Sequence, residues 1–512
     1  MKRFRFSVEP ITLHNSKSSG TFLGKRVFLL FISFQVLVFF PALRNSSPWS
    51  DDWGYIYFVG DPSRNIVSDA VSAGRPILGL LDQVAYQNEF ITRNPVLLQM
   101  VSVLGLLLLQ FSLYSKLRQN GFANPMLTLA PLLLILIPGI QGYVYFLSCF
   151  PYAWACLLGF LSFDFINSRT PFWIIIGSIF LIIATLIYPA GAMFYLLSYL
   201  IDFITRFRQE RDFCSNIKHL FCILVKLMMY FAFSLIIARI TQSYANIEKA
   251  TRIELVNSLE SLMEKVVWAS TRLFVSEFRV FTVASPSPKR AVIETALVLS
   301  LLVFFILKPF DSLTKNRAFN FFIMLFLPLL GAIPNLIILE NQFEFRTLTS
   351  TYAMSLILWA YCFQEISHSV LRVKIKKKVF FYQYLDKLLG LICMLLVAFT
   401  VFHAQGDSKD LWVKPSLIRD NLTESALNKI KIDNSSPICM IIPPTVYEPL
   451  DKLGIYSLKS DLASSWVPEP YMRLKLEQAN LIQERKIYVT EDVNGCDASS
   501  VAINYKILGM SD

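Results

Sequence analysis

The adjacent acidic residues Asp51 and Asp52 are the first side chains in the sequence that could do chemistry. Trp49, Trp53 and Tyr55 flank them. A carboxylate can take the proton from an attacking hydroxyl group, and a neighbouring carboxylate raises the pKa of one member of the pair, which makes it a better base. The aromatic rings offer flat faces on which a sugar ring can stack. A solvated turn with aromatic anchors is the alternative interpretation of the pair alone.

A basic motif, Gly74-Arg75-Pro76, follows in the same segment. Proline at the first position of a helix pre-sets its φ angle. An arginine just ahead of that helix, together with free backbone N–H groups, makes a site for phosphate. Arg64, between the two motifs, is a second candidate ligand for a phosphate group. A base, an aromatic platform and an anion site in one segment are more specific together than any of them alone.

A second candidate segment is the polar turn that contains Glu344 and Arg346, between two apolar runs. Ionisable residues at the end of a membrane span are candidates for function. In that interpretation Arg346 holds a phosphate beside Arg75, and Glu344 contacts substrate. An ordinary polar turn with a Glu-Arg surface pair is the alternative.

The composition predicts that these segments are positioned by membrane-spanning helices. Hydrophobic residues make up 54% of the 512 residues and charged residues 17%, and the mean hydropathy is +0.50. A soluble chain carries nearer a quarter charged residues. The net charge of +11 does not indicate a nucleic-acid partner, because the basic residues lie beside apolar runs, where the positive-inside rule places them.

About eleven spans are expected, each long enough to cross a bilayer as a helix. They lie near residues 26–43, 95–114, 124–139, 144–165, 171–187, 189–205, 219–239, 291–309, 319–339, 348–366 and 387–403. Some of these are short or contain proline, notably around Pro131 and Pro138, and any one pair could form a re-entrant hairpin instead. With the N-terminus in the cytoplasm, every short basic loop falls inside, and the opposite orientation would put all of them outside. The first loop, a segment near 240–290 with an amphipathic helix, and the tail then lie outside.

The fold class that follows is an all-α polytopic membrane protein with a small α/β domain after it. Residues 1–25 form a cytoplasmic N-terminus, residues 26–403 the transmembrane domain with its first external loop at 44–94, and residues 404–512 an extracytoplasmic domain. Strands are expected at Ile438–Ile442 and Lys486–Val489, and a helical stretch at Tyr471–Gln483. Cys439 and Cys496 could form a disulfide in an external tail, with two unpaired thiols as the alternative.

The run Asp51-Asp52-Trp53, followed by Gly74-Arg75-Pro76 and Leu80-Leu81, resembles the GtrII-type glucosyltransferases of bacterial O-antigen and, more broadly, the GT-C superfamily. The resemblance is sharpest over residues 48–84. It implies an undecaprenyl-phosphate sugar as donor, a lipid-linked O-antigen or similar surface glycan as acceptor, and a location in the bacterial inner membrane with the reaction on the periplasmic side. Asp51 or Asp52 would be the base. The family's arginine three positions after the pair is replaced by Tyr55 here.

Two other functions remain open. A flippase for a lipid-linked saccharide predicts charged residues deep within the spans, and Asp164 and Arg239 come closest, although both lie near span ends. An O-antigen polymerase would use the central external segment, which holds Arg252, Arg272 and Arg279. No cofactor is expected with certainty. The four histidines are scattered, so a histidine metal site is not expected, whereas a divalent cation bound by Asp51 and Asp52 is possible.

Overall fold

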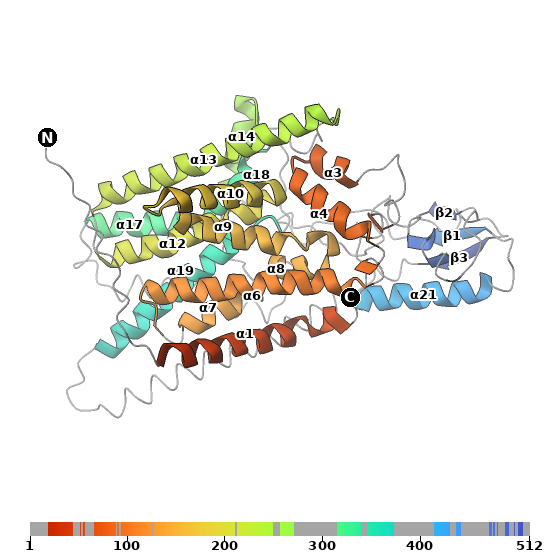
Figure 1. The fold of residues 1–512 in the computed structure, drawn as a ribbon, viewed down its shortest axis with the longest axis horizontal. Coiled ribbons are helices and arrows are strands. Elements are labelled where there is room, and N and C mark those ends of the chain that lie inside the picture. Colours follow the sequence, from red (N-terminus) through yellow and green to blue (C-terminus); the bar gives the residue numbers. More distant parts are fainter. Residues whose placement is uncertain are drawn as a thin grey trace.

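In a computed structural model the protein is an elongated bundle of helices with a small sheet beyond one end (Figure 1). The structure describes residues 19–44, 52, 55–56, 66–88, 90–91, 94–123, 126–209, 212–248, 256–270, 315–338, 346–372, 414–430, 437–441, 471–473, 475–476, 479, 487–490, 496 and 500–504. Two of the expected spans, 291–309 and 387–403, lie outside these residues.

Six helical segments of the described part are long and apolar enough to cross a membrane. They are Lys25–Arg44 in α1 (Ser19–Arg44), α6 (Val96–Gln119), Leu147–Ile166 with α9 (Tyr152–Ile166), Pro189–Arg208 with α12 (Phe194–Arg208), α13 (Phe213–Tyr244), and Phe319–Ile337 with α17 (Lys315–Phe326) and α18 (Ile333–Ile337). Each coincides with an expected span. The chain is therefore a mostly helical, polytopic membrane protein.

The region of the expected spans 124–139 and 144–165 contains a break, which the prolines there left open as an alternative to two straight spans. Instead of a turn near residues 140–143, the chain forms α7 (Met126–Leu134) and α8 (Pro138–Tyr145), a pair bent by 50°. Pro138 stands at the first position of α8 and fixes the new helix there. A short 3₁₀ helix, η1 (Leu147–Cys149), follows α8 and leads into α9. Proline positions, rather than hydropathy, set these boundaries.

The helix α9 lies at the centre of the bundle, packed against α6, α12, α11 (Pro189–Ala192) and α10 (Pro171–Ile187). Glycines permit the closest of these approaches. A Cβ atom on Gly159 would lie 2.8 Å from the carbonyl oxygen of Ala192, and one on Gly177 would lie 2.7 Å from the backbone nitrogen of Ile166. Both distances are shorter than van der Waals contact. The helices can therefore approach this closely only because glycine has no Cβ atom.

The helix α19 (Thr349–Arg372) covers the expected span 348–366 and lies inside the bundle. Its side chains from residue 349 to residue 362 are all buried, and it packs against α7, α12 and the 3₁₀ segment η5 (Leu327–Ala332). Several of these side chains are hydroxyls, which a helix can place in its interior because they bond to the preceding turn, as Ser355 does to Thr351. By contrast, α13 exposes most of its apolar surface.

The two ends of the bundle carry different residues. At one end, Lys116 pairs with Asp164, and Arg208 pairs with Glu365 at 3.4 Å and donates to the carbonyl oxygen of Asn120 at 3.2 Å. These residues lie at or near the C-terminal ends of α6, α9 and α12. At the opposite end, two short helices of the expected first loop, α3 (Ile66–Ser72) and α4 (Pro76–Tyr86), pack against α13 and α10 (Figure 1). The basic side chains and the first loop are thus separated by the length of the bundle.

The expected amphipathic helix of the central segment is α14 (Leu259–Trp268). Ser258 and Ser261 form its capping box. The inward side chain of Lys265 donates to the carbonyl oxygen of Asn335 at 3.2 Å. Five apolar side chains on the other face are exposed: Leu259, Leu262, Met263, Val266 and Val267.

The described part of the tail contains one helix and three strands, beyond the end of the bundle that carries α3 and α4 (Figure 1). The helix is α21 (Lys414–Ile430), and the strands are β1 (Ile438–Ile441), β2 (Ile487–Thr490) and β3 (Val501–Asn504). They form a parallel sheet in the order β2-β1-β3. A disulfide joins Cys439 in β1 to Cys496. The expected strands coincide with β1 and β2, whereas α21 and β3 were not anticipated.

Candidate active site

The motif Gly74-Arg75-Pro76 forms the junction between α3 and α4. Gly74 has a φ of +74°, and its N–H donates to the carbonyl oxygen of Val71 at 2.9 Å while that of Arg75 donates to Ala70 at 2.8 Å. This pair of bonds is a Schellman motif, which ends α3 and favours glycine at its left-handed position. Pro76 then begins α4. The three residues therefore fix Arg75 at a sharp corner between two helices.

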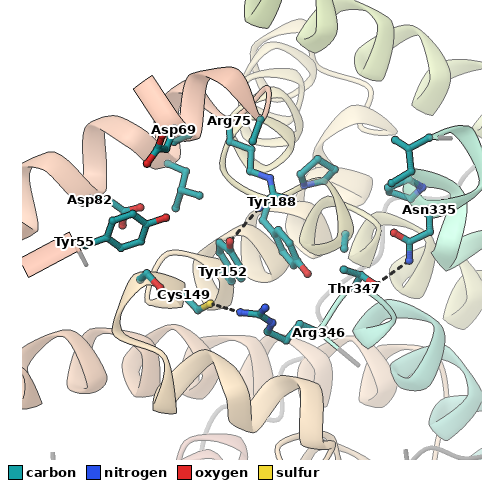
Figure 2. A pocket seen from close by; sticks show the side chains of 18 residues that line it. Tyr55, Asp69, Arg75, Asp82, Cys149, Tyr152, Tyr188, Asn335, Arg346 and Thr347 are labelled. Carbon is teal, nitrogen blue, oxygen red and sulfur yellow. Dashed lines mark hydrogen bonds between the residues drawn. The ribbon is translucent and has the colours of Figure 1, made fainter. Parts of the chain in front are cut away.

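Arg75 and Arg346 line one cavity of about 210 Å³, although they are 271 positions apart in the sequence. The cavity lies where α3 and α4 meet the N-terminal ends of α9, α11 and α19. Figure 2 shows acidic side chains on one side of it, Asn335 and Thr347 on the other, and the two arginines between them. The lining residues with polar side chains are Tyr55, Asp69, Arg75, Asp82, Ser148, Cys149, Tyr152, Tyr188, Asn335, Arg346 and Thr347.

Each guanidinium group contacts uncharged side chains in or near the cavity wall. Nη1 of Arg75 donates to the hydroxyl of Tyr152 at 3.2 Å, and its Nε is buried without a hydrogen-bond partner in the described part of the chain. Nη1 of Arg346 lies 3.7 Å from Sγ of Cys149, and its Cζ lies 4.5 Å from the ring centroid of Phe146. Guanidinium groups match the oxygens of a phosphate in geometry and charge, so two of them lining one cavity suit a phosphate group.

A stack of two tyrosines forms the floor beneath Arg75. The rings of Tyr152 and Tyr188 are parallel to within 4°, with centroids 3.9 Å apart, and Cζ of Arg75 lies 5.3 Å from the centroid of Tyr188. Behind them, the hydroxyl of Tyr143 donates to the carbonyl oxygen of Arg346 at 3.1 Å. Tyr143 is a buried core residue, while Tyr152 lines the cavity.

Asp52 is completely buried and does not line the cavity. Its carboxylate accepts hydrogen bonds from the backbone N–H groups of Leu147 and Ser148, both at 2.9 Å, and from the hydroxyl of Tyr86 at 3.3 Å. Charge-assisted bonds of this kind hold a segment firmly in place. Because Ser148 lines the cavity, Asp52 anchors the first loop to the cavity wall.

Two carboxylates that had not been selected from the sequence line the cavity, namely Asp69 on α3 and Asp82 on α4. Asp69 is exposed at the rim. Asp82 is 2% exposed, and its Oδ1 has no hydrogen-bond partner in the described part of the chain. Burial, and secondly the negative charge of Asp52, raise the pKa of Asp82 well above its usual range. A sequence signal existed, because Asp82 falls at the helical spacing of Leu78 and Tyr86 on the inner face of α4.

Among the other predicted site residues, Tyr55 lines the cavity, with its ring centroid 5.7 Å from that of Tyr86. Trp49, Asp51, Trp53, Arg64 and Glu344 lie outside the described residues. Within the described ranges, no three histidine, cysteine or acidic side chains gather as metal ligands would. The possible cation site at Asp51 and Asp52 therefore stays a prediction.

Comparison with known proteins agrees with the family suggested by the acidic and Gly-Arg-Pro motifs. No curated protein matches the chain. The family model described as glucosyl transferase GtrII matches residues 40–357, which is more than half of the sequence. The match begins just before the acidic pair, includes both arginines of the cavity, and ends within α19. The chain belongs to the GtrII family of glucosyl transferases, and it is a membrane glycosyltransferase.

Proposed function

We propose that the protein moves a glucosyl group from a polyprenyl phosphate, such as undecaprenyl-phosphate glucose, to a sugar hydroxyl of lipid-linked O-antigen or a related surface glycan. The observation that carries this proposal is the presence of Arg75 and Arg346 in one cavity. A sugar linked to a lipid through a single phosphate presents one anionic group next to the carbon that reacts. Two guanidinium groups, brought together from distant segments, suit that group in charge and shape.

The reaction we infer is a single displacement. The acceptor hydroxyl attacks the anomeric carbon, the bond from that carbon to the phosphate oxygen breaks, and the lipid phosphate leaves as an anion. The arginines stabilise the charge that develops on the phosphate, which is worth more in a site shielded from water. A carboxylate of the first loop takes the proton of the hydroxyl.

We further propose that the cavity opens on the periplasmic side of the inner membrane. It lies at the N-terminal ends of α9, α11 and α19, whereas Lys116 and Arg208 lie at the other end of the bundle. Basic residues favour the cytoplasmic side. In this orientation the phosphate of a carrier lipid in the outer leaflet lies at the depth of the cavity, and the tail with α21 and the sheet is extracytoplasmic.

The test is transfer of radiolabelled glucose from undecaprenyl phosphate to lipid-linked O-antigen by the purified protein, with Arg75→Ala and Arg346→Ala as variants. A hydrogen bond to a charged group contributes about 1.5–3 kcal/mol, so each variant should raise the donor KM by roughly 10- to 100-fold. Arg206→Ala is the matched control, because Arg206 pairs with Asp202 on α12 at 3.1 Å, among the basic residues of the opposite end. It should leave the donor KM unchanged.

Absence of transfer by the wild-type protein, with this donor and acceptor, would refute the proposed reaction. Movement of the lipid-linked sugar across vesicles without any transfer would favour a flippase. A donor KM that is the same in both arginine variants as in the wild type would rule out the phosphate site while leaving the reaction itself intact.

A further inference from the structure

The carboxylate of Asp82 lies in the cavity but has no role in the reaction described so far. Asp82 lines the cavity but is only 2% exposed. Its Oδ1 has no protein partner in the described ranges. A buried carboxylate oxygen without a hydrogen bond is costly, so such groups are rare without a purpose. An incoming hydroxyl group would supply the missing hydrogen bond.

The inner face of α4 sets Asp82 at a defined distance from the phosphate site. Arg75 caps the helix, and Asp82 follows seven positions later on the same face, about two turns or roughly 11 Å along the axis. In a single displacement the leaving phosphate and the attacking hydroxyl lie on opposite sides of the anomeric carbon. A phosphate at Arg75 therefore places the hydroxyl away from the arginine, toward Asp82. Figure 2 shows Asp82 and Tyr55 on one side of the cavity and Arg75 in its middle.

Asp52 stands behind Asp82 and fixes its chemical character. The two carboxylates are close enough for the charge of Asp52 to act on Asp82. They differ in environment, because Asp52 accepts three hydrogen bonds from the protein, which favour its charged form, while Asp82 has an oxygen left open. When two like charges share a site, the less solvated one holds a proton more readily. The acidic residues that form a working pair are then Asp52 and Asp82, rather than the adjacent Asp51 and Asp52.

We propose that Asp82 is the proton acceptor of the reaction and that Asp52 is its positioning residue. This inference rests on the proposed transfer from a lipid phosphate. As the acceptor oxygen forms its bond to the anomeric carbon, its proton passes to Oδ1 of Asp82, and the electron pair of the breaking bond goes to the lipid phosphate. The proton is later lost to water. Nothing else is consumed.

The titratable groups around Asp82 come from several elements. They are Tyr86 on α4 itself, Asp69 on α3, Cys149 on η1, Tyr152 on α9, and Asp52, which precedes these helices. The helix α10 also packs against α4, but it has no titratable side chain. Of these, Asp52 carries the negative charge that acts on Asp82. The base must be unprotonated, so activity should fall as the pH falls through the raised pKa of Asp82.

Asp82→Asn tests the proposal first. General-base catalysis contributes about 10²- to 10⁴-fold, so kcat should fall by that factor while the donor KM stays near the wild-type value. Asp202→Asn, the same change in an ion pair at the far end of α12, is the matched control. Asp51→Asn is compared in the same assay. Binding of undecaprenyl-phosphate glucose, followed as the rise in melting temperature, shows that each variant is folded and holds the donor.

The pH profile separates a proton acceptor from a structural role. Asp52→Asn removes the negative charge that raises the pKa of Asp82. The acidic limb of the pH–activity profile of this variant should therefore move to lower pH, and this shift does not depend on the fraction of the protein that is active. Formate should partly restore the activity of Asp82→Ala, because it can enter the space of the missing carboxylate. An Asp82→Asn variant with wild-type kcat would overturn the proposal, and so would rescue by formate of Asp51→Ala in place of Asp82→Ala. The proposed transfer itself would stand in either case, since the wild-type protein would still use the lipid-phosphate donor.

Discussion

At the scale of single residues, the cavity depends on a side chain that does not line it. The carboxylate of Asp52 ties the first loop to the backbone of Leu147 and Ser148, and it also bonds the hydroxyl of Tyr86 on α4. Three segments of chain therefore meet at one buried charge. Its burial is tolerable because each hydrogen bond is made to the charged form. The cavity wall at Ser148 and Cys149 has its shape for this reason.

Asp52→Ala should therefore destabilise the folded protein. Three buried donors would lose their partner, and each unsatisfied donor costs about 1–3 kcal/mol. The melting temperature in detergent, measured by intrinsic fluorescence, should fall clearly. Tyr86→Phe removes only the longest of the three bonds, 3.3 Å, and should have a smaller effect. Equal melting temperatures for the two variants would contradict an anchoring role for Asp52.

The two arginines of the cavity could be predicted from the sequence, whereas the acidic partner of Asp52 could not. Gly74 and Pro76 fix the corner that carries Arg75 through local backbone rules, and a sequence displays such rules directly. Arg346 was identified by its position at the end of a span. The approach of Asp82 to Asp52 depends instead on tertiary contacts, namely the packing of α4 against α10 and the hydrogen bonds of Asp52 to Leu147, Ser148 and Tyr86. The pairing of Asp51 with Asp52 stays a prediction, because Asp51 lies outside the described residues.

At the scale of helices, the cavity wall depends on the contact between α9 and α11. Tyr152 at the start of α9 and Tyr188 just before α11 form the stacked pair. A few residues further into the bundle, Gly159 allows the backbone of Ala192 to approach to 2.8 Å of the place a Cβ atom would occupy. The neighbouring atom is a backbone carbonyl, which has little freedom to move. The spacing of the tyrosines is thus set by a glycine in the membrane.

Gly159→Ala should push α11 away from α9 and impair the enzyme. Overpacking of this kind costs about 1–3 kcal/mol, and displacement of Tyr188 should also raise the donor KM. Gly105→Ala is the matched control, because its new Cβ atom would meet mainly the side chain of Trp154, at 3.1 Å, which can shift. Melting temperature and donor KM are measured for both variants. A Gly159→Ala protein indistinguishable from Gly105→Ala would rule out this account of the wall.

Helices were predicted well where hydropathy alone decides, and less well where polar or broken segments are buried. The span around α13 has a high mean hydropathy and exposes much of its surface, so hydropathy alone reveals it. The bent pair α7 and α8 is apolar in both halves, and only Pro138 marks the break. In the tail, the sequence of α21 is so polar that its apolar residues do not mark out a buried face. Nevertheless, Ala426 and Leu427 lie in the core of that region.

At the scale of the whole molecule, the two ends of the bundle differ. Lys116, Arg206 and Arg208 lie at one end, and the cavity with its two arginines, α3 and α4 lie at the other, with α21 and the sheet beyond them (Figure 1). The disulfide between Cys439 and Cys496 lies in that outer part, and disulfides persist in oxidising compartments such as the periplasm. The basic end and the disulfide are independent observations that both support the proposed orientation.

Two positions allow this orientation to be tested by cysteine labelling. Cys214, an exposed residue at the start of α13, belongs to the basic end, and exposed Gln87, at the end of α4, belongs to the cavity end. With Cys222 and Cys393 replaced by serine, a membrane-impermeant maleimide should leave Cys214 unlabelled in intact spheroplasts and label it in inverted vesicles. In a background that also carries Cys214→Ser, Gln87→Cys should show the reverse pattern. Labelling of Cys214 in intact spheroplasts would place the basic end outside, and with it the cavity on the cytoplasmic side, where a carrier lipid in the outer leaflet could not reach Arg75.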